Sequence, residues 1–200
     1  MLFRALTVGI LFLQMGCAST PPPRYYTLGP TAQASTGSSS ASASAGSSGF
    51  SVSIGPVSVP AVVDRPQIVV SLSENQVSFD ESNRWAAPLQ DGLCAVIAEN
   101  LAGILGTPSV TVFPKESGAD ANYRVAVYLE RFESAPGVSA VMEATWVVRR
   151  AKDGMARTGR TSVREAVQDR SFEALAAAHS RAAGRLSADI ADAIRALDLT

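Results

Sequence analysis

Cys17 is the residue of this chain whose type and position most clearly predict a reaction. It follows the basic Arg4, the short apolar run 5–13 and the small Gly16. A charged start, an apolar stretch and a small residue before the cut are typical of a secretory signal. A cysteine at the first mature position supplies the thiol that takes a diacylglyceryl group before the signal is removed. We therefore expect a lipoprotein signal at 1–16 and acylation of Cys17, with palmitate-type chains holding the mature chain in a membrane.

An ordinary secretory signal with a coincidental cysteine is the alternative for this segment. Gln14 stands three residues before Cys17, at a position that a branched aliphatic residue usually holds. The run 5–13 is shorter than the ~20 apolar residues that a membrane-spanning helix needs. It is therefore better explained as part of a signal than as a transmembrane anchor.

Other residues suited to catalysis or metal binding are few. His179 is the only histidine, whereas a zinc site built on His or Cys needs several ligands. No Gly-x-Ser-x-Gly sequence presents a serine to His179, and no glycine-rich phosphate loop is found. We predict no enzyme activity, no metal and no cofactor, with His179 hydrogen-bonded in the core. Cys94, within the apolar run 93–97, is predicted to be a buried free thiol.

Two polar clusters stand beside rigid turns. One is the sequence 64–67, between two apolar strands, and the other is 83–89, at the start of a helix. Arginines beside rigid turns are common in interfaces, whereas Trp85 more simply pins the helix start onto the sheet. Two tyrosines shortly after the signal are also unusual for a spacer. The candidate interface residues are Tyr25, Tyr26, Asp64, Arg65, Gln67, Arg84 and Trp85.

The first half of the chain predicts three strands and a helix. Alternating apolar residues indicate a strand at 51–59, broken by Gly55-Pro56, and further strands at 67–72 and 76–79. Apolar residues at helical spacing predict a helix over 87–105, with Pro88 in its first turn and Gly106 closing it.

The second half predicts more strands and a long final helix. The strands are expected at 109–113, 123–129, 140–150 and 158–167, the last being polar enough for a sheet edge. Asp169 or Ser171 is expected to cap a helix whose apolar stripe ends at Leu197. The main elements follow the order β-β-β-α-β-β-β-α. We expect an α+β sandwich, with one mainly antiparallel sheet and both helices on one face.

The bulk composition bounds the domain organisation and the partners. After the signal, residues 17–49 comprise the lipidated start, a short strand near Tyr25 and a Ser/Ala/Gly-rich stretch predicted to be a disordered loop or tether. Whether the short strand docks on the domain is left open. Residues 50–200 are expected to form a single domain. The net charge of −1 gives no electrostatic footprint for nucleic acid.

Several short motifs, in order along the chain, carry a resemblance to a known family. They are Tyr25-Tyr26-Thr27-Leu28, Ile54-Gly55-Pro56-Val57-x-Val59-Pro60, Asp64-Arg65-Pro66-Gln67-Ile68-Val69, Arg84-Trp85-Ala86-x-Pro88-Leu89, Arg131-Phe132-Glu133 and Leu186-Ser187-x-Asp189-Ile190-Ala191. The chain resembles the PqiC/YmbA-type lipoproteins, the auxiliary lipoprotein component of ABC-type and MCE-type lipid transport systems. The match spans nearly the whole mature chain.

The resemblance implies a periplasmic domain that is anchored by lipid in the outer membrane of a Gram-negative bacterium. It implies an MCE-domain partner (PqiB-like) that forms a tunnel, and a homo-oligomeric ring at the outer end of that tunnel. The implied role is docking or gating for phospholipid movement, without covalent chemistry. Ala18 agrees with the outer membrane, because an aspartate after Cys17 would favour retention at the inner membrane.

Two other functions stay open. The first is an assembly or scaffold lipoprotein that binds an outer-membrane protein or a cell-wall polymer. The second is a lipoprotein hydrolase that uses His179.

Overall fold

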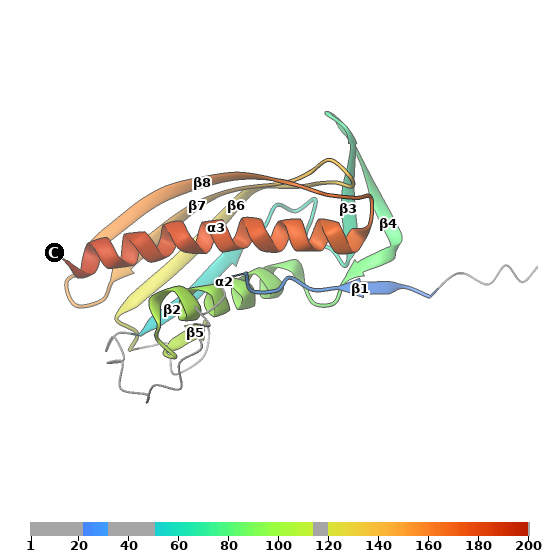
Figure 1. Cartoon of the computed structure of the whole chain (residues 1–200). Coiled ribbons are helices and arrows are strands. Elements are labelled where there is room, and N and C mark those ends of the chain that lie inside the picture. The colour runs from blue at the N-terminus through green and yellow to red at the C-terminus, as the bar shows by residue number, and fades with distance from the viewer. Residues whose placement is uncertain (1–21, 32–50, 114–119, 200) are drawn as a thin grey trace, which may run out of the picture.

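The structure is a computed structural model that describes residues 22–31, 51–113 and 120–199 (Figure 1). Its elements are β1 (Arg24–Tyr26), β2 (Val52–Ser58), β3 (Gln67–Ser73), β4 (Gln76–Trp85), α2 (Leu89–Leu105), β5 (Val110–Val112), β6 (Tyr123–Ala135), β7 (Ser139–Arg150), β8 (Ala156–Ala166) and α3 (Phe172–Asp198). The predicted α+β class is confirmed. The predicted signal at 1–16, Cys17 and nearly all of the Ser/Ala/Gly-rich stretch lie outside the described residues.

The strands form two mixed sheets instead of the single, mainly antiparallel sheet that the sequence predicts. A five-stranded sheet has the order β5-β2-β6-β7-β8, and a three-stranded sheet has the order β1-β4-β3. Strand β2 pairs in parallel with both β5 and β6, and β1 pairs in parallel with β4. Parallel pairs need long connections, so short-range sequence patterns cannot reveal them. The polar strand β8 is at the edge, as predicted.

Both helices cover one face of the five-stranded sheet (Figure 1). Helix α2 packs on β2 and β5, whereas α3 packs on β6, β7 and β8. The predicted stripe of α3 is confirmed, because its apolar members from Leu175 to Leu197 are buried. The inward positions of β7 are confirmed in the same way, from Ala140 to Val148.

Three strands are longer or more continuous than predicted. Strand β2 is not broken at Gly55-Pro56, because Ile54 and Val57 both pair with β6 around a one-residue bulge. Gly55 has a φ of 128°, which favours glycine, and its peptide bond to Pro56 is cis. Strand β4 continues to Trp85, where pairing with β1 extends it. Strand β6 similarly continues past a bulge to Ala135.

The helix ends follow the residues that cap them. Helix α2 begins at Leu89, so Pro88 stands at its N-cap and not in its first turn as predicted. The helix ends at Leu105, and the left-handed φ of 66° at Gly106 confirms the predicted closing role of this glycine. Helix α3 is capped by Ser171, whose Oγ accepts the Ala174 N–H at 3.1 Å. Asp169 instead accepts the Ser171 N–H at 2.7 Å, and hydrogen bonding to the side chain and then the backbone of Ser171 lowers the pKa of that carboxyl group.

The far end of α3 is held by a buried arginine. Arg150, on β7, is 3% exposed, and its guanidinium donates to the Leu197 carbonyl and to the Asp153 carboxylate. The phenol of Tyr123 donates to Asp198 at 2.9 Å. A cation at a helix C-terminus satisfies carbonyls that lack helical partners and complements the helix dipole. No helix in the described ranges is both long and apolar enough to cross a bilayer.

Candidate functional site

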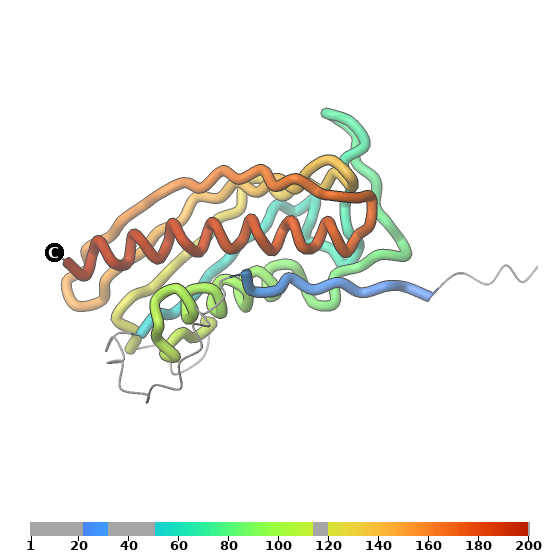
Figure 2. Tube along the Cα trace, viewed as in Figure 1, coloured from blue at the N-terminus to red at the C-terminus, as the bar shows by residue number. Residues whose placement is uncertain are grey.

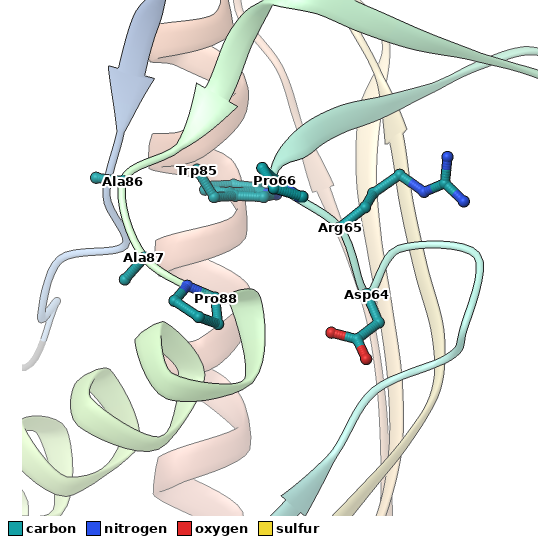
Figure 3. A pocket seen from close by; sticks show the side chains of 7 residues that line it. All are labelled: Asp64, Arg65, Pro66, Trp85, Ala86, Ala87 and Pro88. Carbon is teal, nitrogen blue, oxygen red and sulfur yellow. The ribbon is translucent and has the colours of Figure 1, made fainter.

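The two polar clusters predicted from the sequence meet at the start of α2. The Trp85 N–H donates to the Pro66 carbonyl at 2.8 Å, and Gln67 pairs with Arg84 across β3 and β4. Together the clusters enclose a pocket of about 350 Å³. It is lined by Asp64, Arg65, Pro66, Trp85, Ala86, Ala87 and Pro88 (Figure 3).

The pocket has an apolar floor and a charged rim. The Trp85 and Pro66 rings lie side by side, and the Asp64 carboxylate is directed into the opening (Figure 3). The Arg65 guanidinium points the other way and lies 3.9 Å from the centroid of the Phe79 ring. Its Nε is buried without a hydrogen-bond partner. A cation over an aromatic face is held by attraction to the ring electrons, so Arg65 is partly fixed beside exposed apolar surface.

The predicted tyrosines lie on β1, directly beside these clusters. Tyr26 pairs in register with Trp85, and its hydroxyl donates to Asn83 Oδ1 at 2.8 Å. Tyr25 pairs with Arg84 and is 61% exposed. The sequence left open whether this segment docks on the domain, and the structure shows that it does. Trp85 also lines a second pocket of about 180 Å³ on the β1 side.

The structure thus gathers all seven candidate interface residues at one end of the three-stranded sheet. Sequence reasoning missed two further contributors on β4, Phe79 and Glu81. The Phe79 ring contacts the Arg65 guanidinium. The Glu81 carboxylate accepts a hydrogen bond from Gln67 Nε2 at 3.2 Å and forms an ion pair with Arg84 at 3.5 Å. Residues two apart on one strand lie on the same face, so Phe79 and Glu81 could have been assigned to this surface from the sequence. That step needed β4 to be predicted to Trp85, whereas the predicted strand stops at residue 79.

Trp85 combines a structural role with its place in the pocket. It is 6% exposed, and its ring meets Phe132 edge-on with centroids 6.1 Å apart. It also meets His179 edge-on at 6.3 Å. These contacts pack Trp85, four residues before α2 begins, against β6 and α3, so its side chain serves the core as well as the pocket.

His179 is a core residue, as predicted. It is fully buried, and its Nε2 lies 2.8 Å from Ser134 Oγ, while Nδ1 has no hydrogen-bond partner. Burial lowers the pKa of His179 to about 3. A hydrolytic triad needs an exposed serine and an acid on the second nitrogen, so this Ser–His pair lacks the geometry of one.

Cys94 is a buried free thiol, as predicted. Burial, with a smaller contribution from Asp91, raises its pKa to about 11. Because the thiolate is the reactive form, Cys94 is poorly suited to nucleophilic or redox chemistry. Within residues 22–31, 51–113 and 120–199, no three His, Cys, Asp or Glu side chains are grouped so as to hold a metal ion.

Residues 26–191 match the family described as the ABC-type transport auxiliary lipoprotein component. The chain therefore belongs to this family, which is a class of transport lipoproteins and not a class of enzymes. No curated protein matches the sequence.

Solved structures establish the same fold at low sequence identity. The crystal structure of an uncharacterised protein has a TM-score of 0.68 and 19% identity, covering 87% of this chain and 99% of that chain. A protein from Xanthomonas campestris has a TM-score of 0.53 and 19% identity, covering 70% of this chain and 81% of that chain. A PelC dodecamer from Paraburkholderia phytofirmans, at a TM-score of 0.40 and 16% identity, is too distant to inform the assembly.

Proposed function

We propose that this protein is an outer-membrane-anchored periplasmic lipoprotein that serves as the auxiliary subunit of an MCE-type lipid transport system. Acylated Cys17 holds it in the membrane, and a homo-oligomeric ring docks or gates a PqiB-like MCE-domain partner. The protein carries out no covalent chemistry and uses no cofactor. Ala18, in place of an aspartate after Cys17, supports the outer membrane over the inner one.

The observation that carries this proposal is the convergence of three distant segments on one exposed end. Residues 24–26, 64–67 and 83–85 meet there, and the chain leading back to Cys17 leaves from the same β1 segment. Arginines, tyrosines and a tryptophan beside an apolar pocket are the composition of interface hot spots. Arg24, at this end, stands only seven positions after Cys17, the proposed anchor.

The experiment is a mild-detergent pull-down of the lipidated protein from its native envelope, followed by mass spectrometry. We expect recovery of an MCE-domain protein, and its loss in Arg65→Glu and in Cys17→Ser. Arg157→Glu, at an exposed arginine on β8, is the matched control and should retain the partner. Retention of the partner by Arg65→Glu at wild-type yield would remove Arg65 from the interface.

A scaffold lipoprotein is the alternative that the same experiment separates. Recovery of an outer-membrane barrel or peptidoglycan fragments without an MCE-domain protein would favour it over the transport role. Melting curves of Arg65→Glu accompany the pull-down, because a loss of partner counts only for a folded variant. We expect the melting temperature to fall by only a few degrees, because the lost cation–π contact lies on the exposed Phe79 ring.

A further inference from the structure

The segment Arg24–Thr31, here named the strap, is bound by the domain beyond its β1 pairing. Figure 2 shows it running beside α2 after it leaves β4. The Gly29 N–H donates to Ser180 Oγ on α3 at 3.1 Å, and the Thr31 N–H donates to Asn100 Oδ1 on α2 at 2.9 Å. Asn100 is fully buried and Ser180 is 7% exposed. Each of these polar side chains stands on a buried, mostly apolar helix face, and each accepts a hydrogen bond from a strap backbone N–H.

Gly184 provides the close approach between α3 and the strap. A Cβ at this position would overlap Thr31 Oγ1 and lie 3.3 Å from Thr31 Cβ. Glycine inside a helix costs about 0.5–1 kcal/mol relative to alanine. Gly184 therefore makes α3 less stable than alanine would at this position. In return, the missing Cβ leaves the space that the Thr31 side chain occupies.

We propose that the groove between α2 and α3 is a clasp that holds the strap reversibly and sets how far the domain stands from the membrane. This step rests on the proposed acylation of Cys17. With the strap seated, the tether is the seven residues 17–23 before Arg24, which span at most about 25 Å. With the strap released, the tether is the thirty-four residues 17–50 before Ser51, which span at most about 120 Å.

The contacts that hold the strap are few enough to open without unfolding the domain. Three β1 residues pair with β4, and hydrogen bonds join the strap to Asn83, Ala86, Asn100 and Ser180. Tyr26 and Leu28 are partly buried, and the Tyr26 ring lies 6.0 Å from the Phe172 ring. Segments with few buried apolar contacts open locally at a lower free energy than global unfolding. The clasp is thus a two-state element whose open state lengthens the tether several-fold.

The first test follows hydrogen exchange of the peptide covering the strap in the full-length protein. Gly184→Ala should lower the protection of the Gly29 and Thr31 amides and speed tryptic cleavage after Arg24, because the new methyl group displaces the Thr31 side chain. Global stability should be unchanged or higher. Thr31→Gly in the Gly184→Ala background should restore protection, because it removes both atoms that the new methyl group meets. Gly92→Ala on α2 has open space and should leave protection unchanged. Unchanged protection in Gly184→Ala would overturn the clasp.

The second test locks the clasp with a disulfide between Thr31→Cys and Gly184→Cys. The Cβ separation of 3.3 Å is just below the ~3.5–4.5 Å range of disulfides. Oxidation should give an internally bridged monomer on a non-reducing gel. A disulfide-linked dimer would instead show that the groove takes the strap of a second copy, and would overturn the tether role.

The third test measures reach with the lipidated protein on phospholipid vesicles that contain an acceptor lipid. A donor dye is placed at Glu74→Cys on the exposed β3–β4 turn. Energy transfer to the bilayer should be higher in the locked variant than in Gly184→Ala, and equal transfer would overturn the reach-setting role. If mass spectrometry finds Cys17 without acyl groups, the proposed function fails, whereas the exchange experiment still judges the clasp by itself.

Discussion

Phe132 and His179 stack nearly parallel in the core, with ring centroids 3.9 Å apart and an angle of 11° between the planes. One ring comes from β6 and the other from α3, so the pair joins the sheet to the helix that covers it. Trp85 meets both rings edge-on. The pocket at the start of α2 is therefore built directly onto the central core, and changes in this aromatic cluster should reach the candidate interface.

The pH dependence of stability should report the burial of His179. Its pKa is about 3 in the folded chain, against about 6.5 when unfolded, so protonation favours the unfolded state. The stabilising contribution is complete above pH 6.5 and is lost as pH falls toward 3, at about 1.4 kcal/mol per pH unit. Urea titrations between pH 7.5 and 5 should show a loss of about 2 kcal/mol in the free energy of unfolding that is absent in His179→Gln. Equal slopes for the two proteins would contradict the burial of a neutral histidine.

Replacing Gly159 by alanine should destabilise the protein. Gly159 on β8 lies under the Trp146 indole, and a Cβ there would overlap the ring. The ring is also fixed by its Nε1–H, which donates to Thr161 at 3.0 Å, so it cannot move without losing a hydrogen bond. We expect a loss of about 1–3 kcal/mol in urea unfolding. Gly92→Ala is the control and should raise stability by up to about 1 kcal/mol, because α2 has room for the methyl group.

Arg150→Met should lower the melting temperature by several degrees. The substitution leaves the buried Leu197 carbonyl without its guanidinium donor and removes the ion pair with Asp153 at 2.6 Å. The neighbouring Arg149 is exposed, and its guanidinium donates to the Gly154 carbonyl at 3.1 Å. Arg149→Met should therefore melt close to the wild type. Similar melting temperatures for the two variants would mean that Arg150 does not secure the end of α3.

Cys94 should resist thiol reagents in the folded protein. Its pKa of about 11 leaves little thiolate at pH 8, and its side chain is buried. A maleimide at pH 7.5 should label it only after guanidinium unfolding. Leu199→Cys, at a residue that is 89% exposed, provides the fast-reacting reference. Labelling of Cys94 at a comparable rate without denaturant would show that α2 opens readily.

The elements with strong periodicity could be predicted from the sequence, and the pairing between distant segments could not. The stripe of α3 and the alternation of β7 each report burial on one side of one element, so local residues determine them. The parallel pairing of β1 with β4 joins Tyr26 to Trp85, fifty-nine positions apart, and no local pattern encodes it. The division into two sheets was missed for a similar reason, because β2 pairs with the distant β5 and β6 and not with β3, the next strand along the chain.

For the candidate site, sequence reasoning found the residues but not their arrangement. Rigid turns and aromatic residues marked the two clusters, whereas their meeting around one pocket depends on the β3–β4 register. Sequence reasoning did not identify the residues that contact the strap. Asn100 and Gly184 stand inside helices, where a polar residue or a glycine looks merely unfavourable. An isolated glycine inside a helix is nevertheless a signal of close packing, and it was the available clue to the clasp.

The hydrogen bond from Gly29 to Ser180 joins residues that are 151 positions apart. Synthesis delivers the amino end first, so the strap leaves the ribosome before α3 exists to bind it. Contacts between residues so far apart in sequence need closure of the long loop between them, which slows their formation. The first described segment of the chain therefore has to wait for the last helix before it is fully held in the fold.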